Sequence, residues 1–364
     1  MNCSIDTPRL RLALQALSAV ASHRETLPIL SGILVEAENQ AVRLTAHNLS
    51  LGLETTLGAR VEIPGKTVLP ARLLTDLSRR LDDTSVLLDV TEHGAKVTWQ
   101  HGEAHLPTQS ADEYPRPPFG DMSQAISVAG PEFRRGVEHV AFAAGADPAQ
   151  PILEGVRIRF GSESLEFLAT DRSRVALSRR PVEHGQSVDG SVVFPASALI
   201  TLNRLSGSVP TYELSWDPHG VTVRWDGTRL YSRLLDGSYP EVDRMIPEEY
   251  PLQAVVQKTA LRGACDRMGL LVDPAAPQIY MRFDSEGVEM RSESQTTRAR
   301  ERIPSRKLGP DLEISFNAYY LAEALERIEG DDIVLELKGP EDLMRIRPLD
   351  RRDQYIVVLP MMMS

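Results

Sequence analysis

The sequence has 364 residues, a formal net charge of −11 at pH 7 and two cysteines, Cys3 and Cys265. Its length suits two or three domains, the cysteine count argues against a disulfide framework and favours the cytoplasm, and the acidic balance does not by itself suggest nucleic-acid binding. The first residues, MNCSIDTPRLRL, do not resemble a signal peptide. The longest apolar helical stretch, LALQALSAVA, is too short to span a bilayer, so we expect no association with a membrane.

The first predicted elements form a series of helices and strands. Apolar residues recur at three- and four-residue spacing over 8–21, which predicts an amphipathic helix. After the motif PILSG (28–32), alternating residues predict strands within 33–57. A strand and a second helix are predicted over 68–81, and further strands separated by a turn over 85–100.

The same series occurs twice more. PILEG at 151–155 repeats the first motif after roughly 120 residues, and similar strands follow it. A more divergent third copy of the strands begins near Pro277. A period of this length is the size of a domain. In the second and third copies, helices are predicted over 131–144 and 258–271, and a strand followed by a helix over 193–205 and over 314–328.

The repeat predicts an α+β fold of three repeated domains, covering 1–122, 123–250 and 251–364. Each domain is expected to pack two helices on antiparallel sheets with about eight strands. In the PIL-x-G motifs we expect proline to start a strand, the two aliphatic residues to enter a core, and glycine to allow close packing.

The sequence offers weak signals for catalysis. Gly65-Lys66-Thr67 resembles the end of a phosphate-binding loop. However, six residues separate Gly58 from Gly65 where such a loop has four, and the sequence after it predicts a strand rather than the required helix. His101, Glu103 and His105 alternate on a predicted strand and could share one face as metal ligands, but nothing suggests a fourth ligand or a supporting shell. We therefore expect a protein that is not an enzyme, with no catalytic residues, metal or cofactor.

Five stretches carry a resemblance to a known family: TLPILSGILVEA (26–37), LEFLATDRSRVALSRRP (165–181), LLDGSYPEVDRMIP (234–247), SFNAYYLAEAL (315–325) and YIVVLPMMM (355–363). In this order they resemble the bacterial sliding clamps, the beta subunits of DNA polymerase III. The resemblance covers the whole chain. It implies DNA-clamp domains, a head-to-tail homodimer forming a six-domain ring, and a processivity factor that encircles double-stranded DNA without sequence specificity.

The ring implied by the resemblance predicts basic helices in an otherwise acidic chain. The predicted helices do carry more basic than acidic residues, which would let a DNA-facing surface meet phosphates. Arg24, in the loop before the first repeated strand, matches a family position that contacts DNA. The predicted DNA-binding residues are Arg24, Arg72, Arg79, Arg80, Arg134, Arg135, Arg204, Lys258 and Arg262.

The resemblance also implies a pocket between the second and third domains. There, family members bind linear motifs of the DNA polymerase III alpha subunit, the clamp loader, other polymerases and repair proteins. Methionines suit such a groove because they repack easily. The matching residues are Ile152, Leu153, Thr170, Arg172, Ser173, Arg174, Val175, Pro240, Arg244, Met245, Asn317, Tyr320, Val357, Val358, Leu359, Pro360 and Met361.

The chain departs from the family pattern at this pocket. Gly-His is common where Arg172-Ser173 stand, and the tail reads LPMMMS where Met-Pro-Met-Arg-Leu is common. Both departures bear on which peptides the pocket prefers. A buried last strand is the alternative for Val357.

For the subunit interface, the resemblance points to Ala104 and Leu106 of the first domain and Leu270 and Leu271 of the third. A large aromatic residue is common where Ala104 stands, and the two leucines could equally be core residues at a helix end. Two other functions remain open: a specialised clamp paralogue that acts as a peptide-binding scaffold outside main replication, and, more distantly, a hydrolase that uses the strand of His101.

Overall fold

The computed structural model describes residues 1–21, 27–123, 125–182, 190–294 and 296–362, and in addition leaves out the side chains of residues 243 and 244. The contacts divide the chain into two compact units. Unit 1 comprises Met1–Gly130 and Thr201–Leu234, and unit 2 comprises Pro131–Ile200 and Leu235–Ser364. Each unit is described by itself below.

In the described part of the chain, the first two predicted copies have the same order of helices and strands, and the third has one additional strand. The first is β1 (Asn2–Asp6), α1 (Thr7–Ser18), β2 (Gly32–Glu38), β3 (Ala41–His47), β4 (Leu51–Ile63), β5 (Gly65–Pro70), α2 (Ala71–Ser78), β6 (Ser85–Thr91), β7 (Gly94–Trp99) and β8 (Gly102–Leu106). The second is β9 (Ile126–Ala129), α3 (Gly130–Val140), β10 (Gly155–Phe160), β11 (Ser164–Thr170), β12 (Arg174–Pro181), β13 (Gly190–Pro195), α4 (Ala196–Ser206), β14 (Thr211–Trp216), β15 (Gly220–Trp225) and β16 (Thr228–Arg233).

The third copy is β17 (Leu252–Gln257), α5 (Lys258–Gly269), β18 (Gln278–Asp284), β19 (Gly287–Glu293), β20 (Arg298–Ile303), β21 (Ser305–Leu308), β22 (Leu312–Asn317), α6 (Ala318–Arg327), β23 (Asp332–Leu337), β24 (Met344–Pro348) and β25 (Gln354–Val358). Pro304 separates β20 from β21, because proline has no N–H to donate to a strand ladder. The predicted α+β class, with two helices and about eight antiparallel strands in each copy, is confirmed.

Antiparallel pairing links neighbouring copies within each unit. In unit 1 the main strand order is β8-β7-β6-β1-β4-β16-β15-β14-β9, so β4 of the first copy pairs with β16 of the second. In unit 2 one sheet has the order β13-β10-β11-β12-β25-β24-β23-β17-β21, so β12 pairs with β25, and a second sheet has the order β20-β19-β18-β22.

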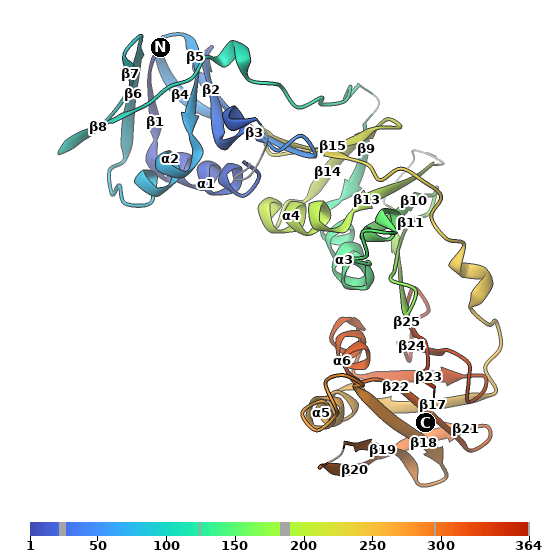
Figure 1. Ribbon diagram of the computed structural model, residues 1–364. Coiled ribbons are helices and arrows are strands. Elements are labelled where there is room, and N and C mark those ends of the chain that lie inside the picture. The colour runs from blue at the N-terminus through green and yellow to red at the C-terminus, as the bar shows by residue number, and fades with distance from the viewer. Residues whose placement is uncertain (22–26, 124, 183–189, 295, 363–364) are drawn as a thin grey trace. The chain divides into compact units, whose positions relative to one another are not determined.

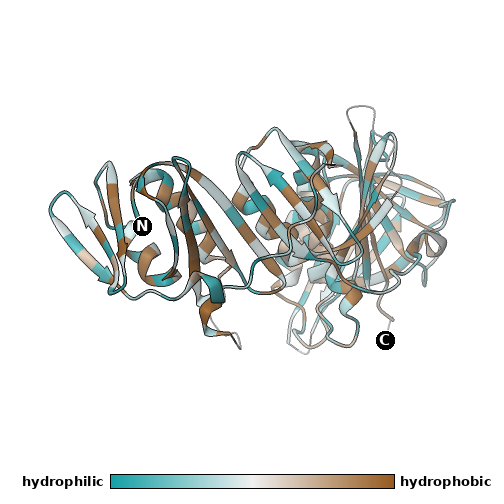
Figure 2. Cartoon of the chain, turned by 90° about the horizontal axis from the view of Figure 1, so that it is seen from above, coloured by the Kyte–Doolittle hydropathy of each residue, from teal (hydrophilic) through white to brown (hydrophobic). Residues whose placement is uncertain are grey.

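The helices cover one side of the strands. α1 lies beside α2 in unit 1, and α5 lies beside α6 in unit 2 (Figure 1). Hydrophobic and hydrophilic residues alternate along many strands (Figure 2), as expected when one face of a strand meets a core. In unit 2 the core includes Phe133 and Phe167, whose ring centroids are 5.3 Å apart.

The PIL-x-G motifs differ from the prediction in one respect. Pro28–Ser31 and Pro151–Glu154 each form a single turn of 3-10 helix, and the strand begins only at the glycine. The fixed φ of proline suits the first turn of a helix as well as a strand. The expected close approach at the glycine is confirmed, because a Cβ at Gly32 would lie 2.4 Å from Val68 Cγ1.

Candidate functional site

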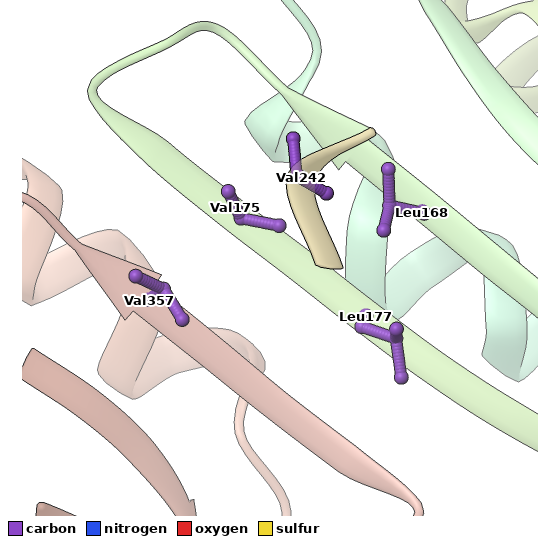
Figure 3. Close-up of a cluster of buried hydrophobic side chains, with 5 residues drawn as sticks. All are labelled: Leu168, Val175, Leu177, Val242 and Val357. Carbon is purple, nitrogen blue, oxygen red and sulfur yellow. The ribbon is translucent and has the colours of Figure 1, made fainter. Parts of the chain in front are cut away.

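β12 pairs with β25, and both strands carry predicted pocket residues. Val175 lies opposite Val357 in this register. Both belong to a buried cluster with Leu168, Leu177 and Val242 (Figure 3). Figure 3 shows that the cluster draws side chains from two strands of the second copy, from β25, and from the short segment that carries Val242. The fold thus brings the predicted pocket residues Val175 and Val357 together.

Tyr239 fixes the loop that carries the predicted residues Pro240 and Met245. Its hydroxyl donates to the carbonyl of Gly155 (3.3 Å) and accepts from the N–H of Thr170 (3.1 Å). Burial raises the pKa of Tyr239 to about 12, so the hydroxyl keeps its proton. Met245 follows this anchored segment with 66% of its surface exposed.

Arg174 is buried at the start of β12 and is surrounded by partners. Its guanidinium carbon lies 4.5 Å from the centroid of the Tyr320 ring. Two of its nitrogens bond to the Asp171 carboxylate (3.0 Å) and the Phe142 carbonyl (3.0 Å), and a third pairs with Glu323 on α6. A buried arginine so fully paired ties β12 to α6.

The turn before β12 places Arg172 at the surface. Asp171 Oδ1 accepts from the N–H groups of Ser173 and Arg174, both at 2.9 Å. Arg172 then adopts a φ of 77°, a left-handed conformation that costs a non-glycine residue about 1 kcal/mol. Its exposed side chain pairs with Asp147 at 3.6 Å. The turn therefore presents a cation at the surface.

The C-terminal tail is held by hydrogen bonds on both sides. The N–H of Leu359 donates to the Ser173 carbonyl (2.9 Å), and the N–H of Met361 donates to the Ser315 carbonyl (2.8 Å). Gln278 donates to the carbonyl of Met362, whose side chain is 94% exposed. The tail thus runs from the turn before β12 to β22 with its backbone fixed and a methionine side chain in solvent.

The predicted pocket residues differ in exposure. Ile152, Ser173, Pro240, Leu359, Pro360 and Met361 are half-buried. Asn317 is also half-buried, and its side chain caps α6 by accepting from the N–H of Tyr319 at 2.9 Å. The side chain of Arg244 lies outside the described residues. The buried members are Leu153, Thr170, Arg174, Val175, Val357 and Val358.

Three of the predicted DNA-binding arginines share one acidic neighbour on α2. Asp76 pairs with Arg72 (3.8 Å) and Arg79 (3.4 Å), and its carbonyl accepts from Arg80 (2.8 Å). All three arginines are exposed, and one carboxylate cannot balance them. Arg11, by contrast, donates to the carbonyls of Ser78 and Leu81, so it joins α1 to the end of α2.

The other predicted DNA-binding residues differ in their exposure and in the groups with which they pair. Arg204 is exposed, and the exposed Arg135 pairs with Glu132 at 3.5 Å. Arg262 pairs with both Asp266 and Glu326 at 3.4 Å. The Lys258 ammonium donates to the Ile328 carbonyl at 3.1 Å. Arg134 is half-buried on α3, and Arg24 lies outside the described residues.

The predicted interface residues differ in exposure. β8, which carries Ala104 and Leu106, ends the strand order of unit 1. Ala104 is half-buried and Leu106 is 9% exposed. In unit 2, Leu270 follows α5 with 83% exposure, and Leu271 is half-buried. Leu270 is therefore not a core residue, which removes one of the two sequence-based alternatives for it.

The weak catalytic signals have ordinary structural partners. Gly65 begins strand β5, and Lys66 pairs with Asp112 at 2.5 Å. Glu103 pairs with Lys96 at 2.5 Å. In the described ranges, no three His, Cys, Asp or Glu side chains are grouped to hold a metal ion. Among the helices of that same part of the chain, none has the length and apolarity to cross a membrane.

Sequence reasoning missed a buried polar network at the other end of the β12–β25 pair. Arg180 donates to His139 Nδ1 (2.6 Å), so Nε2 carries the proton and donates to the Glu329 carboxylate (3.0 Å). Burial, with the nearby Arg180 charge, lowers the pKa of His139 to about 4. Arg351 pairs with the same Glu329. A buried histidine at a helix end gives no periodic signal, so only the fold reveals this network.

Comparison with known proteins gives matches along almost the whole chain. Three domain models of the DNA polymerase III beta subunit match it: the N-terminal domain over residues 1–118, the central domain over 127–241 and the C-terminal domain over 243–362. The chain is 30% identical over 361 residues to the beta sliding clamp of Synechococcus elongatus, covering 96% of each chain. It is 28% identical to the beta sliding clamp of Staphylococcus epidermidis, covering 93% of each.

Solved structures agree with these matches. The DNA polymerase sliding clamp of Bacillus subtilis aligns with a TM-score of 0.97 at 25% identity, with full coverage of both chains. The DNA polymerase III subunit beta of Pseudomonas aeruginosa aligns with a TM-score of 0.95 at 24% identity, again over both complete chains.

Proposed function

The chain belongs to the DNA polymerase III beta subunit family, the bacterial DNA sliding clamps, and from this premise we propose how it acts: as a closed homodimeric ring around duplex DNA that tethers the replicative polymerase. The three domains, with proposed boundaries 1–122, 123–250 and 251–364, would give six per ring. Enclosure holds the ring on DNA, and tethering raises the local concentration of polymerase at the primer end. We propose that the chain has no catalytic activity of its own and works in the cytoplasm.

The observation that carries this proposal is the buried apolar cluster of the β12–β25 pair, with exposed methionines close to it in the chain. We propose that this cluster, called the floor below, lies under a peptide groove. Val242 belongs to the floor, and Met245 follows three residues later with its side chain in solvent. The pinned tail adds Met361 and the exposed Met362. Exposed flexible apolar side chains beside a rigid apolar floor favour a groove for linear motifs. The proposed ligands are segments of the polymerase, the clamp loader and repair proteins.

We propose that Arg172 forms an ion pair with an acidic residue of the bound peptide. Its only ion pair among the described residues is the exposed one with Asp147, which is weak enough to be exchanged. An acidic residue of a bound peptide can take the place of Asp147. Glycine is common in the family at the position of Arg172. Because this chain has an arginine there, it would favour peptides with an acidic residue beside the motif.

The basic helices would supply the contact with DNA. Arg72 and Arg79 pair with the single carboxylate of Asp76, and Arg80 donates to the Asp76 carbonyl, which leaves a net positive charge on α2 and the two residues after it. Exposed ion pairs of this kind are weak and exchange readily with phosphate oxygens. Contacts that bind only the backbone carry no sequence preference, which suits a protein that slides.

Two unpaired sheet edges support the proposed dimer. β8 ends one sheet of unit 1 and β20 ends the second sheet of unit 2, and within the described strands each pairs on one side. An unpaired edge is a template for another strand. β8 presents Glu103 near Ala104, whereas β20 presents the exposed Arg298 and Arg300. We propose that β8 of one protomer pairs with β20 of the other, with Leu106, Leu270 and Leu271 packed beside the joint.

Retention on DNA tests the ring. The protein is loaded with a clamp loader and ATP onto nicked circular DNA, separated by gel filtration, and the circle is then cut. Retention on the circle with loss on cutting is expected for a sliding ring. Equal retention on both forms would mean ordinary surface binding. Absence from both, with a loader active on a known clamp, would favour the peptide-binding scaffold outside replication.

A triple variant separates the DNA contact from the peptide pocket. Arg72→Gln, Arg79→Gln and Arg80→Gln together are expected to lower loading and shorten retention, while peptide affinity stays at the parent value. Arg60→Gln is the matched control, because Arg60 is an exposed arginine on β4 paired with Glu62. Unchanged retention in the triple variant would rule out α2 as the DNA contact.

A further inference from the structure

The internal repeat places two equivalent junctions in the chain, one built by β4 with β16 and one by β12 with β25. The registers correspond, since Thr55 lies opposite Thr228 in the first and Ser178 opposite Gln354 in the second. Thr55 and Ser178 stand 123 residues apart, the same distance as Pro28 and Pro151. The backbone agrees, because Leu49 and Arg172, again 123 residues apart, both have positive φ angles, 70° and 77°.

The two junctions differ in the polarity of the side chains that they contain. In unit 2, His139, Arg180 and Glu329 fill the junction with a buried polar network, together with Arg351. The equivalent positions in unit 1 hold small or apolar residues. His139 corresponds to Ala16, Arg180 to Leu57, and Arg351 to Trp225. Glu329 corresponds to Gly207, because each lies eleven residues after the first residue of its helix, α6 (Ala318) and α4 (Ala196) respectively.

Three of these unit 1 positions, Ala16, Leu57 and Trp225, line a cavity. It has a volume of about 250 Å³, and its lining includes Ala16, Leu53, Leu57, Leu205 and Trp225. Apolar cavities of roughly 150 Å³ take up benzene, so this one has room for a longer apolar group. Leu12, also in the lining, is 69% exposed, which places one wall at the surface.

Two polar features mark one side of the cavity. Thr55 and Thr228, both in its lining, share a hydrogen bond of 3.0 Å between their hydroxyls. Arg9 lines the cavity from α1 and is exposed. No carboxylate of the described residues forms an ion pair with the Arg9 side chain, in contrast to Arg72 and Arg79, which pair with Asp76. A guanidinium without an internal partner beside an apolar cavity complements an anionic head group.

We propose that this cavity is a binding site for a small amphiphile with an apolar chain and a single carboxylate. The chain would lie between Ala16, Leu57 and Trp225, and the carboxylate would meet Arg9. The site is separate from the proposed peptide pocket, which lies in unit 2, and it does not depend on the proposed function.

Calorimetric titration of the full chain with sodium octanoate and with octan-1-ol tests the proposal. The parent is expected to bind octanoate more tightly than the alcohol. Arg9→Gln should weaken octanoate binding about tenfold, the effect of losing a charge-assisted bond, and leave binding of the alcohol unchanged. Arg60→Gln, the exposed arginine on β4 outside the lining, should change neither. Equal affinity of the parent for both probes, or no binding of either, would overturn the proposal.

Filling the cavity gives an independent arm. Ala16→Leu places a larger side chain in the space and should abolish binding of both probes while raising the thermal midpoint. If this variant does not fold, Leu205→Phe fills the same space from α4. Parent-like binding of octanoate in a folded, filled variant would also contradict the proposal.

Discussion

The guanidinium of Arg174 lies over the ring of Tyr320, with 4.5 Å between the guanidinium carbon and the ring centroid. Arg174 begins a strand of the second copy, and Tyr320 belongs to a helix of the third. The same guanidinium pairs with Asp171 and Glu323. The arginine therefore joins two repeats that the sequence alone presents as separate units.

Removal of this arginine should destabilise the chain strongly. Arg174→Ala leaves the half-buried Asp171 carboxylate and the Phe142 carbonyl without their partner, so we expect the free energy of unfolding to fall by about 3 kcal/mol. Urea denaturation followed by circular dichroism measures the change. Arg172→Gly is the matched control, because that arginine is exposed and its left-handed backbone favours glycine. The control should be neutral or stabilising by up to about 1 kcal/mol. A loss below about 1 kcal/mol in Arg174→Ala would contradict the structural role.

The free energy of unfolding should decrease as the pH is lowered, because His139 takes up a proton on unfolding. Burial beside Arg180 lowers the pKa of His139 from 6.5 to about 4, so between these values the unfolded chain binds a proton that the folded chain does not. Stability is therefore full above about pH 6.5 and declines as the pH falls toward 4, by about 3 kcal/mol for this group.

His139→Gln should flatten that decline in thermal midpoints measured from pH 7 to pH 4. The exposed His93 serves as the control, and His93→Gln should keep the parent's profile. Burial acts to raise the pKa of Glu329, but its hydrogen bond with Arg351 helps to hold that pKa below its usual range, so this carboxylate contributes at lower pH. An identical profile in His139→Gln and the parent would show that the histidine is not the titrating group.

The glycine of the second PIL-x-G motif should resist substitution. A Cβ at Gly155 would lie 2.5 Å from Val193 Cγ1 and 2.8 Å from Leu235 Cδ1. Gly155→Ala must displace these side chains, and we expect a loss of about 1–3 kcal/mol in the free energy of unfolding. Gly58→Ala on β4 is the control, because nothing lies within 4 Å of its added Cβ. A Gly155→Ala variant as stable as the control would refute the packing argument.

Removal of the tail should weaken peptide binding without unfolding the chain. Deletion from Leu359 onward removes the exposed Met362 and the bonds to Ser173 and Ser315, and leaves β25 in place. We expect a loss of about 2 kcal/mol or more in the affinity for a polymerase-derived peptide, as for a hot spot. Fluorescence anisotropy with a labelled peptide measures the affinity, and a parent-like circular dichroism spectrum is required. Unchanged affinity in the folded deletion variant would remove the tail from the pocket.

The sequence by itself determined the threefold repeat, the α+β class and the family. These depend on local periodicity and on motifs that recur in register, which the order of residues states directly. It also indicated that Gly65-Lys66-Thr67 is not a phosphate-binding loop, because the glycine spacing is wrong and a strand follows rather than a helix.

Only the tertiary structure decided how the copies are joined. The burial of Arg174 and the network around His139 depend on groups more than a hundred residues apart, and no local pattern encodes such contacts. The same holds for the cavity at Ala16, because Ala16, Leu57 and Trp225 line it from different elements and their equivalents at the other junction are charged or polar. Whether a position is filled, paired or empty depends on what faces it, and that is a property of packing rather than of sequence period.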